Sequence, residues 1–267
     1  MSNCYIKTST TATLDVIGIV FSGSPTSEIT TGQNGNGNTI QYCFIEGGER
    51  NIHAEGDITT PNTGNRFLYN VMRSADDYCI YTDDQSNMDI IGNDMILNRS
   101  TFGDALYLLT PEDFRVEQNY IESPDWTVYI LDGNLNGSGR STFINNIVYS
   151  STDYAVYMNE IDNTDIYNNT ILGEPAVYML SHSGIDMRNN MLLSTGDFAF
   201  ENNQSGGFDF LDNNLYFTQG GDLIEYNNTA YTDLAAWQAV EPTFNTASLE
   251  QQPNLLPNSL RINPNSR

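Results

Sequence analysis

The chain has 267 residues, with 34 acidic and 10 basic side chains and a formal net charge of −24. A surface this acidic repels nucleic acid and anionic lipid, so we expect neither nucleic acid nor a membrane as a partner. Three widely spaced cysteines predict no disulfide framework, and no apolar run reaches the length of a transmembrane helix.

The first apolar segment, residues 14–21, begins close to the start of the chain. From residue 43 onward a pattern recurs in which asparagine follows one apolar residue by three positions and precedes another by two. The successive spacings are 27, 23, 26, 27, 23, 21 and 24 residues. Self-similarity at such a period predicts a solenoid. The positions are Cys43, which takes the same place as the asparagines, and then Asn70, Asn93, Asn119, Asn146, Asn169, Asn190 and Asn214.

A second column of residues keeps the same register. In residues 156–158 and 177–179, valine and methionine flank a tyrosine, so the apolar side chains point one way and the tyrosine points the other. The same outward position recurs along the chain, and two columns in phase support one repeat. Its members are His53, Tyr81, Tyr107, Tyr129, Tyr157, Tyr178, Phe200 and Glu225.

Each repeat consists of short apolar runs separated by Asn, Gly or Ser, with no segment of helical periodicity long enough for a crossover helix. Parallel strands joined only by tight turns must coil, and such crossovers are right-handed in about 98% of cases. The sequence therefore predicts an all-β fold, a right-handed parallel β-helix of about eight to nine coils. The asparagines are interpreted as scaffold, because asparagine tolerates a left-handed backbone and its amide can bond to the next coil.

We assign residues 1–230 to the β-helix and residues 231–267 to a C-terminal capping segment that includes a short helix over residues 234–240. No amphipathic helix precedes the first coil, although solenoids need polar caps at their ends. We therefore expect flanking domains of a longer parent chain.

The repeats Ala155–Met158 and Asp165–Ile171, together with the closing segment Tyr231–Trp237, resemble the pectate-lyase-like superfamily of right-handed parallel β-helix proteins. The resemblance implies the secreted bacterial type that acts on or binds polysaccharide. That superfamily also contains esterases, tailspikes, adhesins and non-catalytic modules, so the resemblance does not fix an activity. The catalytic signature of its hydrolases, a glycine-histidine-glycine motif beside paired aspartates, is absent.

The outward column is the predicted substrate surface, because tyrosine combines an apolar ring with a hydroxyl. Inserts at residues 58–64 and 133–139 lengthen the coils that begin at His53 and Tyr129, and they are expected to wall a cleft between them. A column of this kind can equally stabilise the sheet, and such inserts can be neutral. The candidate substrate-binding residues are His53, Tyr81, Tyr107, Tyr129, Arg73 and Asp132.

Carboxylates gather beside this column. Glu55 and Asp83 lie two residues beyond it on adjacent coils, about 5 Å apart at the backbone, and Asp84 follows. Three interpretations stay open: Ca²⁺ bound by Glu55, Asp83 and Asp84; catalytic carboxylates formed by the same three residues; or a solvated acidic rim.

The leading hypothesis is an extracellular protein that binds or processes polysaccharide, as a lyase or a glycoside hydrolase. β-Elimination meets an obstacle, since the predicted groove has no lysine and the net charge opposes a polyanionic substrate unless calcium intervenes. The alternative is a non-catalytic structural or adhesin segment of a larger extracellular protein.

Overall fold

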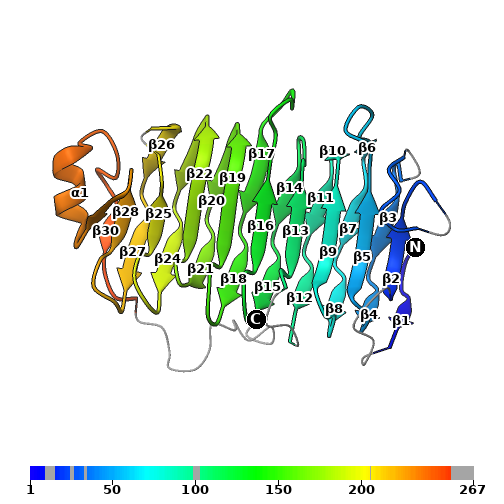
Figure 1. Ribbon diagram of the computed structural model, residues 1–267. Helices are drawn as coiled ribbons and strands as arrows, with labels where there is room; N and C mark the ends of the chain where they lie inside the picture. The colour runs from blue at the N-terminus through cyan, green and yellow to red at the C-terminus, as the bar shows by residue number, and fades with distance from the viewer. Residues whose placement is uncertain (10–15, 25–26, 33–34, 99–102, 205, 254–267) are drawn as a thin grey trace.

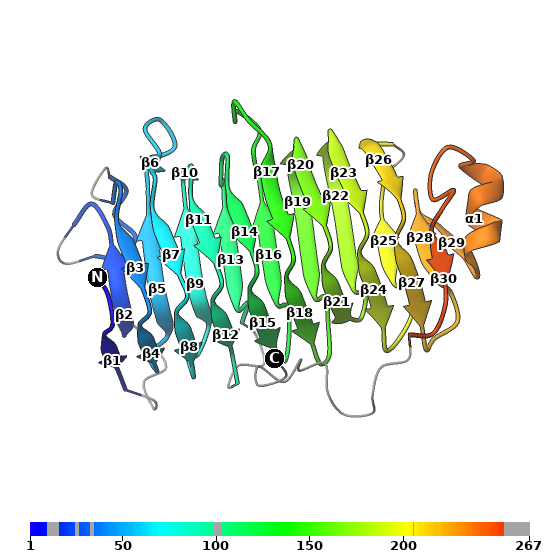
Figure 2. The ribbon, with the colours of Figure 1, turned by 180° about the vertical axis from the view of Figure 1, so that it is seen from behind.

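A computed structural model describes residues 1–9, 16–24, 27–32, 35–98, 103–204 and 206–253. About half of the chain is strand and 3% is helix, in a β-solenoid of about eight turns (Figures 1 and 2). The predicted right-handed parallel β-helix is thereby confirmed as the fold class. Each turn of the chain contributes one strand to each of three sheets, which are named A, B and C in the order in which the chain reaches them. Each of these strands pairs in parallel with its counterpart one turn later.

The strands of each sheet follow one another at one strand per turn. Sheet A consists of β3 (Thr39–Gln41), β7 (Arg66–Leu68), β11 (Asp89–Ile91), β14 (Arg115–Glu117), β17 (Ser141–Ile144), β20 (Thr164–Tyr167), β23 (Ile185–Arg188) and β26 (Phe208–Asp212). Sheet B consists of β1 (Tyr5–Lys7), β4 (Phe44–Glu46), β8 (Val71–Arg73), β12 (Asp94–Ile96), β15 (Tyr120–Ser123), β18 (Ile147–Ser150), β21 (Thr170–Gly173), β24 (Met191–Ser194), β27 (Leu215–Thr218) and β30 (Leu249–Glu250).

Sheet C carries the predicted aromatic column. It consists of β2 (Ile17–Phe21), β5 (Arg50–Glu55), β9 (Tyr78–Asp83), β13 (Leu106–Leu109), β16 (Val128–Leu131), β19 (Val156–Asp162), β22 (Val177–Ser183), β25 (Phe200–Asn202), β28 (Ile224–Tyr226) and β29 (Thr229–Tyr231), the last of which is antiparallel to β28. Two short strands, β6 (Asn62–Thr63) and β10 (Gln85–Ser86), pair with each other beside sheet A.

The core fills the bore of the solenoid. In β16 the side chains of Val128 and Ile130 are fully buried, whereas Tyr129 and Leu131 are only half-buried. This alternation follows from the period of two along a strand, which sends successive side chains to opposite faces of the sheet. Apolar residues therefore stack along the axis from one turn to the next, as the sequence predicts.

The asparagine column forms a continuous buried ladder at the corner between sheets A and B. The backbone N–H of each asparagine donates to the Oδ1 of the asparagine one turn later, over 2.8–3.0 Å. The Nδ2 group donates to that same oxygen and to a sheet A carbonyl of the preceding turn, such as Phe67 for Asn93. The backbone N–H of Cys43 donates to Asn70 Oδ1 and so begins the ladder, which confirms its place in the column.

The left-handed turn at this corner is made by a different residue from the one predicted. The ladder asparagines are not among the residues with positive φ; the residue before each of them is, as at Asn145 with φ 58° and Asn168 with φ 56°. One residue bends the chain and the next supplies the amide. The bending residue is Tyr42, Tyr69, Gly92, Gln118, Asn145, Asn168, Asn189 or Asn213.

The C-terminal end of the solenoid is closed by α1 (Leu234–Val240), the helix predicted over these residues (Figures 1 and 2). Asp233 caps it by accepting a hydrogen bond from the amide of Ala236 at 2.7 Å. Trp237 is buried against Phe200, with ring centroids 6.1 Å apart. No helix in the described parts of the chain has the length and apolarity that crossing a membrane requires. The rest of the predicted capping segment, from residue 254 onward, lies outside the described residues.

The ladder yields a stability prediction for Asn146. Its Oδ1 accepts two bonds from Asn119, and its Nδ2 donates to Val116 and to Asn169 at 2.9 and 3.1 Å. Asn146→Ala leaves these buried partners unpaired, so we expect the free energy of unfolding to fall by about 3 kcal/mol.

The matched control is Asn145→Gly, which removes the exposed neighbouring amide while keeping a residue suited to φ 58°. We expect this variant to stay within about 0.5 kcal/mol of the wild type. Urea unfolding followed by circular dichroism measures both, and equal losses for the two variants would contradict the ladder's role.

Candidate functional site

The outer face of sheet C carries a continuous stack of rings. Tyr81, Tyr107, Tyr129, Tyr157 and Tyr178 are in direct register on consecutive turns. Their neighbouring ring centroids lie 4.7–5.2 Å apart with interplanar angles of 2–14°. The predicted outward aromatic column is thus present over five turns, because residues at one position of the repeat are placed one strand spacing apart.

Stacking determines what these rings offer to a ligand. A ring inside the stack has a neighbour against each face, so its edge and hydroxyl are the parts that remain for solvent. Burial raises the pKa of Tyr107 and of Tyr157 to about 12. These two phenols are therefore neutral at ordinary pH, and the stack presents a row of hydroxyl groups that can donate or accept hydrogen bonds.

The column differs from the prediction at its C-terminal end. Phe200 pairs with Val177 and is fully buried against the capping helix, whereas Glu201 pairs with Tyr178 and takes the outward position. A slip of one residue exchanges the two faces of a strand, so the prediction for Phe200 was wrong. Glu225 pairs with Glu201 and lies in the column as predicted.

A second row of aromatic side chains, which the sequence interpretation missed, runs beside the stack. Tyr78, Trp126 and Tyr154 each precede a column tyrosine by three residues. Trp126 lies parallel to both Tyr129 and Tyr157, at 5.2 Å from each ring and with interplanar angles of 7° and 6°. The constant offset of three residues is the signal that would have found this row.

Asp104 holds the same offset, three residues before Tyr107, and is only 8% exposed. No hydrogen bond to its carboxyl is found among the residues that the structure describes. Burial, together with Asp125 and Asp77 on the neighbouring turns, raises the pKa of Asp104 to about 8. A carboxyl in this state is protonated at neutral pH and can donate a hydrogen bond or a proton.

The predicted acidic cluster is brought together at the opposite end of these strands. Glu55 and Asp83 are in direct register on β5 and β9. The hydroxyl of Thr110 donates to Asp83 Oδ1 at 3.0 Å and to Asp84 Oδ1 at 2.6 Å. Burial and the charges of Asp84 and Glu55 raise the pKa of Asp83 to about 6, even though the bond from Thr110 opposes this change.

His53 stacks on Tyr81 with the ring centroids 4.8 Å apart, but its side chain is fully buried. Its Nε2 atom lies 2.9 Å from a carboxylate oxygen of Glu55, and its Nδ1 atom contacts the guanidinium of Arg50. Arg50 in turn covers the Tyr81 ring at 4.9 Å. In this structure His53 contacts Glu55 and Arg50 and has no exposed surface of its own. Direct contact between His53 and a ligand would require Arg50 and Glu55 to move away from it.

The other two predicted binding residues have different surroundings. Arg73 lies on β8 in sheet B, where its guanidinium pairs with the carboxylate of Asp94 and donates to the Asp94 carbonyl at 2.7 Å. Arg73 ends its sheet B strand just before the chain turns toward sheet C, and its part in substrate binding at the edge of the groove stays a prediction. Asp132 lies where sheet C ends, with φ 54°, in the same left-handed corner as Asp84.

The first insert continues the solenoid. Its residues Asn62 and Thr63 form β6, which pairs with β10 of the next turn. The buried Asn62 amide also donates to the Glu55 carbonyl at 2.8 Å, which ties the insert to the strand that carries the acidic cluster.

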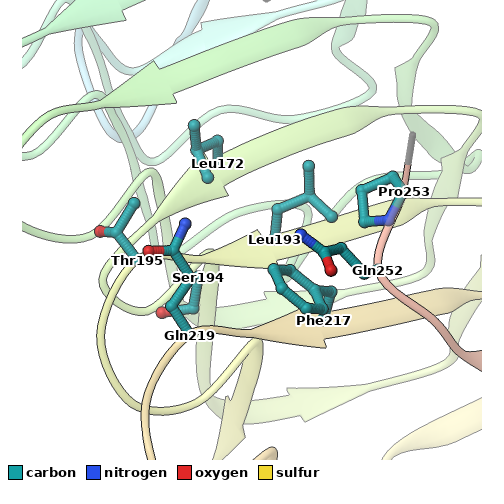
Figure 3. Close-up of a pocket in the computed structure, with 8 residues that line it drawn as sticks. All are labelled: Leu172, Leu193, Ser194, Thr195, Phe217, Gln219, Gln252 and Pro253. Atoms are coloured by element: carbon teal, nitrogen blue, oxygen red, sulfur yellow. The ribbon is translucent and has the colours of Figure 1, made fainter. Parts of the chain in front are cut away.

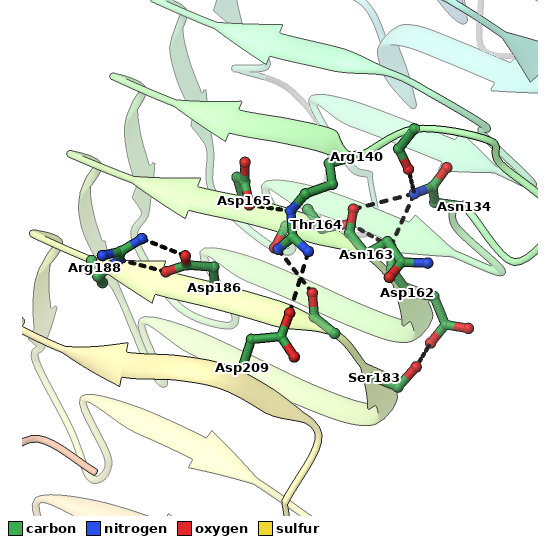
Figure 4. Close-up of polar contacts among 12 residues, drawn as sticks. Asn134, Arg140, Asp162, Asn163, Thr164, Asp165, Ser183, Asp186, Arg188 and Asp209 are labelled. Carbon is green, nitrogen blue, oxygen red and sulfur yellow. Dashed lines mark hydrogen bonds and ion pairs between the residues drawn. The ribbon is translucent and has the colours of Figure 1, made fainter. Parts of the chain in front are cut away.

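The second insert is held to the turns that follow it by hydrogen bonds from Asn134, within the insert, and from Arg140, which directly follows it (Figure 4). The Arg140 guanidinium bonds to Asp165 at 2.6 Å and to Asp209 at 3.3 Å, and the buried Asn134 amide donates to the Asp162 carbonyl at 3.2 Å. Both inserts project from the same edge of the solenoid (Figure 1). The cleft expected between them stays a prediction.

A separate apolar cavity of about 180 Å³ opens near the C-terminal end of sheet B, away from the predicted residues (Figure 3). It is lined by Leu172, Leu193, Ser194, Thr195, Phe217, Gln219, Gln252 and Pro253. Among the described residues, no three His, Cys, Asp or Glu side chains converge closely enough to hold a metal ion. The assignment of calcium to Glu55, Asp83 and Asp84 stays a prediction.

Comparison with protein-family models, with curated proteins and with solved structures found no match to this chain. The fold therefore rests on the strand pairing described above.

The burial of Asp104 predicts a pH-dependent stability. A carboxyl whose pKa rises from 3.8 to about 8 on folding is neutral in both states at low pH. As pH increases from about 4 to about 8 the unfolded form ionises first, so the folded state loses stability in this window. Asp104→Asn removes that cost while keeping the shape of the side chain.

We therefore expect Asp104→Asn to melt at a higher temperature than the wild type at pH 8 and at nearly the same temperature at pH 4. Circular dichroism melts at several pH values measure the difference. Asp209→Asn is the control: it removes a solvent-exposed carboxylate and its ion pair with Arg140 on sheet A, and it should show no gain in melting temperature as the pH rises. A difference between wild type and Asp104→Asn that does not change with pH would contradict the assignment.

Proposed function

We propose that the protein recognises polysaccharide on the outer face of sheet C. The observation that carries the proposal is the gathering, on one face, of a row of tyrosine hydroxyls, the indole of Trp126 and carboxyl groups at both ends of the strands. Sugars are bound by surfaces that combine aromatic groups with a few placed hydrogen-bonding groups. Membership of the pectate-lyase-like superfamily and an extracellular location belong to the same proposal, and the parallel β-helix fold is consistent with the superfamily membership.

If bonds are broken at this surface, its groups favour glycoside hydrolysis over β-elimination. Hydrolysis uses one protonated and one ionised carboxyl. The pKa of Asp83, raised to about 6, makes it a candidate for the protonated partner, and Glu55, in register with it on the adjacent turn, is a candidate for the second carboxyl. Elimination requires a base and a cation for the substrate carboxylate, and the Arg50 guanidinium is already bound to His53 and Glu49.

The second candidate function is a structural or adhesive role without a ligand site. The ring stack favours it, because rings that cover one another's faces stabilise sheet C whether or not a sugar binds. This alternative predicts that changes at the surface alter stability alone.

Two variants separate these functions. Tyr107→Phe keeps the stacked ring and removes one hydroxyl, whereas Trp126→Ala removes the indole of the second row. If sheet C binds sugar, Tyr107→Phe should weaken binding about fivefold, from the loss of about 1 kcal/mol, and Trp126→Ala should weaken it further.

Binding is measured by a glycan array followed by titration calorimetry with the polysaccharide that the array selects. Reducing-end assays detect hydrolysis, and the ultraviolet absorbance of the unsaturated products detects elimination. Tyr149→Phe, on β18 of sheet B, is the matched control. Unchanged affinity in both test variants, or silence in every assay with and without calcium, would overturn the proposal.

We further propose that calcium binds between Glu55, Asp83 and Asp84 by drawing the three carboxylates closer together than they lie in this structure, since carboxylate oxygens suit this ion and opposite charge relieves their repulsion. Calcium at 100 times its Kd should stabilise the fold by about 2.7 kcal/mol, visible as a higher melting temperature that a chelator reverses. Asp83→Asn should abolish the change, and Asp209→Asn should preserve it. A wild-type melting temperature that changes with neither calcium nor chelator would count against the site.

A further inference from the structure

Two cysteines occupy equivalent places on consecutive turns at the N-terminal end of sheet B. Cys4 directly precedes β1 and Cys43 directly precedes β4, and these strands pair in parallel with Tyr5 opposite Phe44. The amide of Phe44 donates to the Cys4 carbonyl at 2.8 Å, so the parallel register extends back to the two cysteines. Residues paired on adjacent strands are about 4.8 Å apart, which lies inside the Cα separation of about 4.4–6.8 Å that disulfides require.

The two thiols also point the same way. Cys4 Sγ lies 3.4 Å from the carbonyl oxygen of Ser2, and Cys43 Sγ lies 3.3 Å from the carbonyl oxygen of Gln41, in each case two residues back. The same local orientation on neighbouring turns places one sulfur beside the other. Burial raises the pKa of the Cys43 thiol, and the charge and the side-chain hydrogen bond of the neighbouring Cys4 thiol raise it as well. Both thiols are reduced in this structure.

We propose that Cys4 and Cys43 form a disulfide when the protein meets an oxidising thiol–disulfide pool. The half-buried Cys4 reacts first: its thiolate attacks a small disulfide such as oxidised glutathione and releases one glutathione thiolate. The Cys43 thiolate then attacks the mixed disulfide at the Cys4 sulfur and releases the second. Two protein thiols are oxidised, one glutathione disulfide is reduced, and the two cysteine protons end on the two glutathione thiols.

The cross-link has a specific task at this position. The asparagine ladder begins at Cys43, so the turn that contains Cys4 lacks the amide contact that joins all later turns of the ladder. In the described residues β1 is held to β4 by three in-register residue pairs, by the Lys7–Glu46 ion pair at 3.2 Å and by the rings of Tyr5 and Phe44, whose centroids lie 5.5 Å apart. A covalent bond between residues 4 and 43 joins this end strand to the next turn. It also lowers the conformational entropy of the unfolded chain, because it closes the segment between the two cysteines into a loop.

The first test counts thiols. Wild-type protein incubated with oxidised glutathione and then denatured should retain one titratable thiol, the fully buried Cys79, and its peptide map should contain residues 4 and 43 linked. Cys79→Ser should then retain none. Three remaining thiols, or a stable glutathione adduct on Cys4 with Cys43 free, would overturn the proposal.

The second test measures what the bond does to the fold. Oxidation should raise the melting temperature of wild type and of Cys79→Ser, and a reductant should reverse the rise. Cys4→Ser and Cys43→Ser should show no rise, since each keeps only one sulfur at the site. A rise that survives in either of these variants would contradict the pairing. Neither test involves a glycan, so its outcome is independent of the proposed function.

Discussion

The constraint on which this molecule depends is the register between successive turns. Apart from β29, the strands of the three sheets pair in parallel with their counterparts, so each position of the repeat lies one strand spacing above the same position of the previous turn. Each repeat position therefore favours a residue type whose side chain packs well against the same residue type on the neighbouring turn. Asparagine amides form a hydrogen-bonded ladder, tyrosine rings form a stack, and branched apolar side chains fill the bore. The side chains that do not stack favourably on themselves are the charged ones.

That exception connects the fold to the chemistry of sheet C. Carboxyl groups at one repeat position are forced to the same short spacing as the tyrosines, although like charges repel at that distance. Where a neighbouring cation is close, as for Asp94 beside Arg73, the pair neutralises the charge. Asp83 and Asp104 lack such a partner among the described residues, and their pKa values rise instead. The repeat therefore produces protonatable carboxyls beside an aromatic surface, and both candidate functions must accommodate them.

The features that follow from the repeat spacing were predicted from the sequence. The features that depend on how neighbouring rows of side chains lie relative to one another were missed. The asparagine column was predicted correctly, because each of its members obeys one spacing rule. The second row with Trp126 and Asp104 was missed, since it is visible only as an offset from the first. Phe200 was placed on the wrong face, because the last turns depart from the regular spacing where the capping helix begins. The position of Arg73 on sheet B, paired with Asp94, was also missed, because a linear pattern does not reveal at which residue the chain turns from sheet B to sheet C.

The two ends of the ladder show how the solenoid compensates when the repeat stops. At the C-terminal end the amide of Asn214 donates to Ser248 Oγ at 3.0 Å, and that hydroxyl bonds to the side chain of Asn245, so a loop after α1 supplies the oxygen that the next asparagine would have provided. At the N-terminal end the ladder asparagine is replaced by Cys43, whose side chain cannot supply the two strong amide bonds of an asparagine. A pair of sulfur atoms on adjacent turns gives this end a covalent means of closure in place of a polar one. The asymmetry follows from the direction of the ladder bonds: each backbone N–H of the ladder donates toward the next turn, so Asn214, the last asparagine of the column, takes its acceptor from outside the repeat.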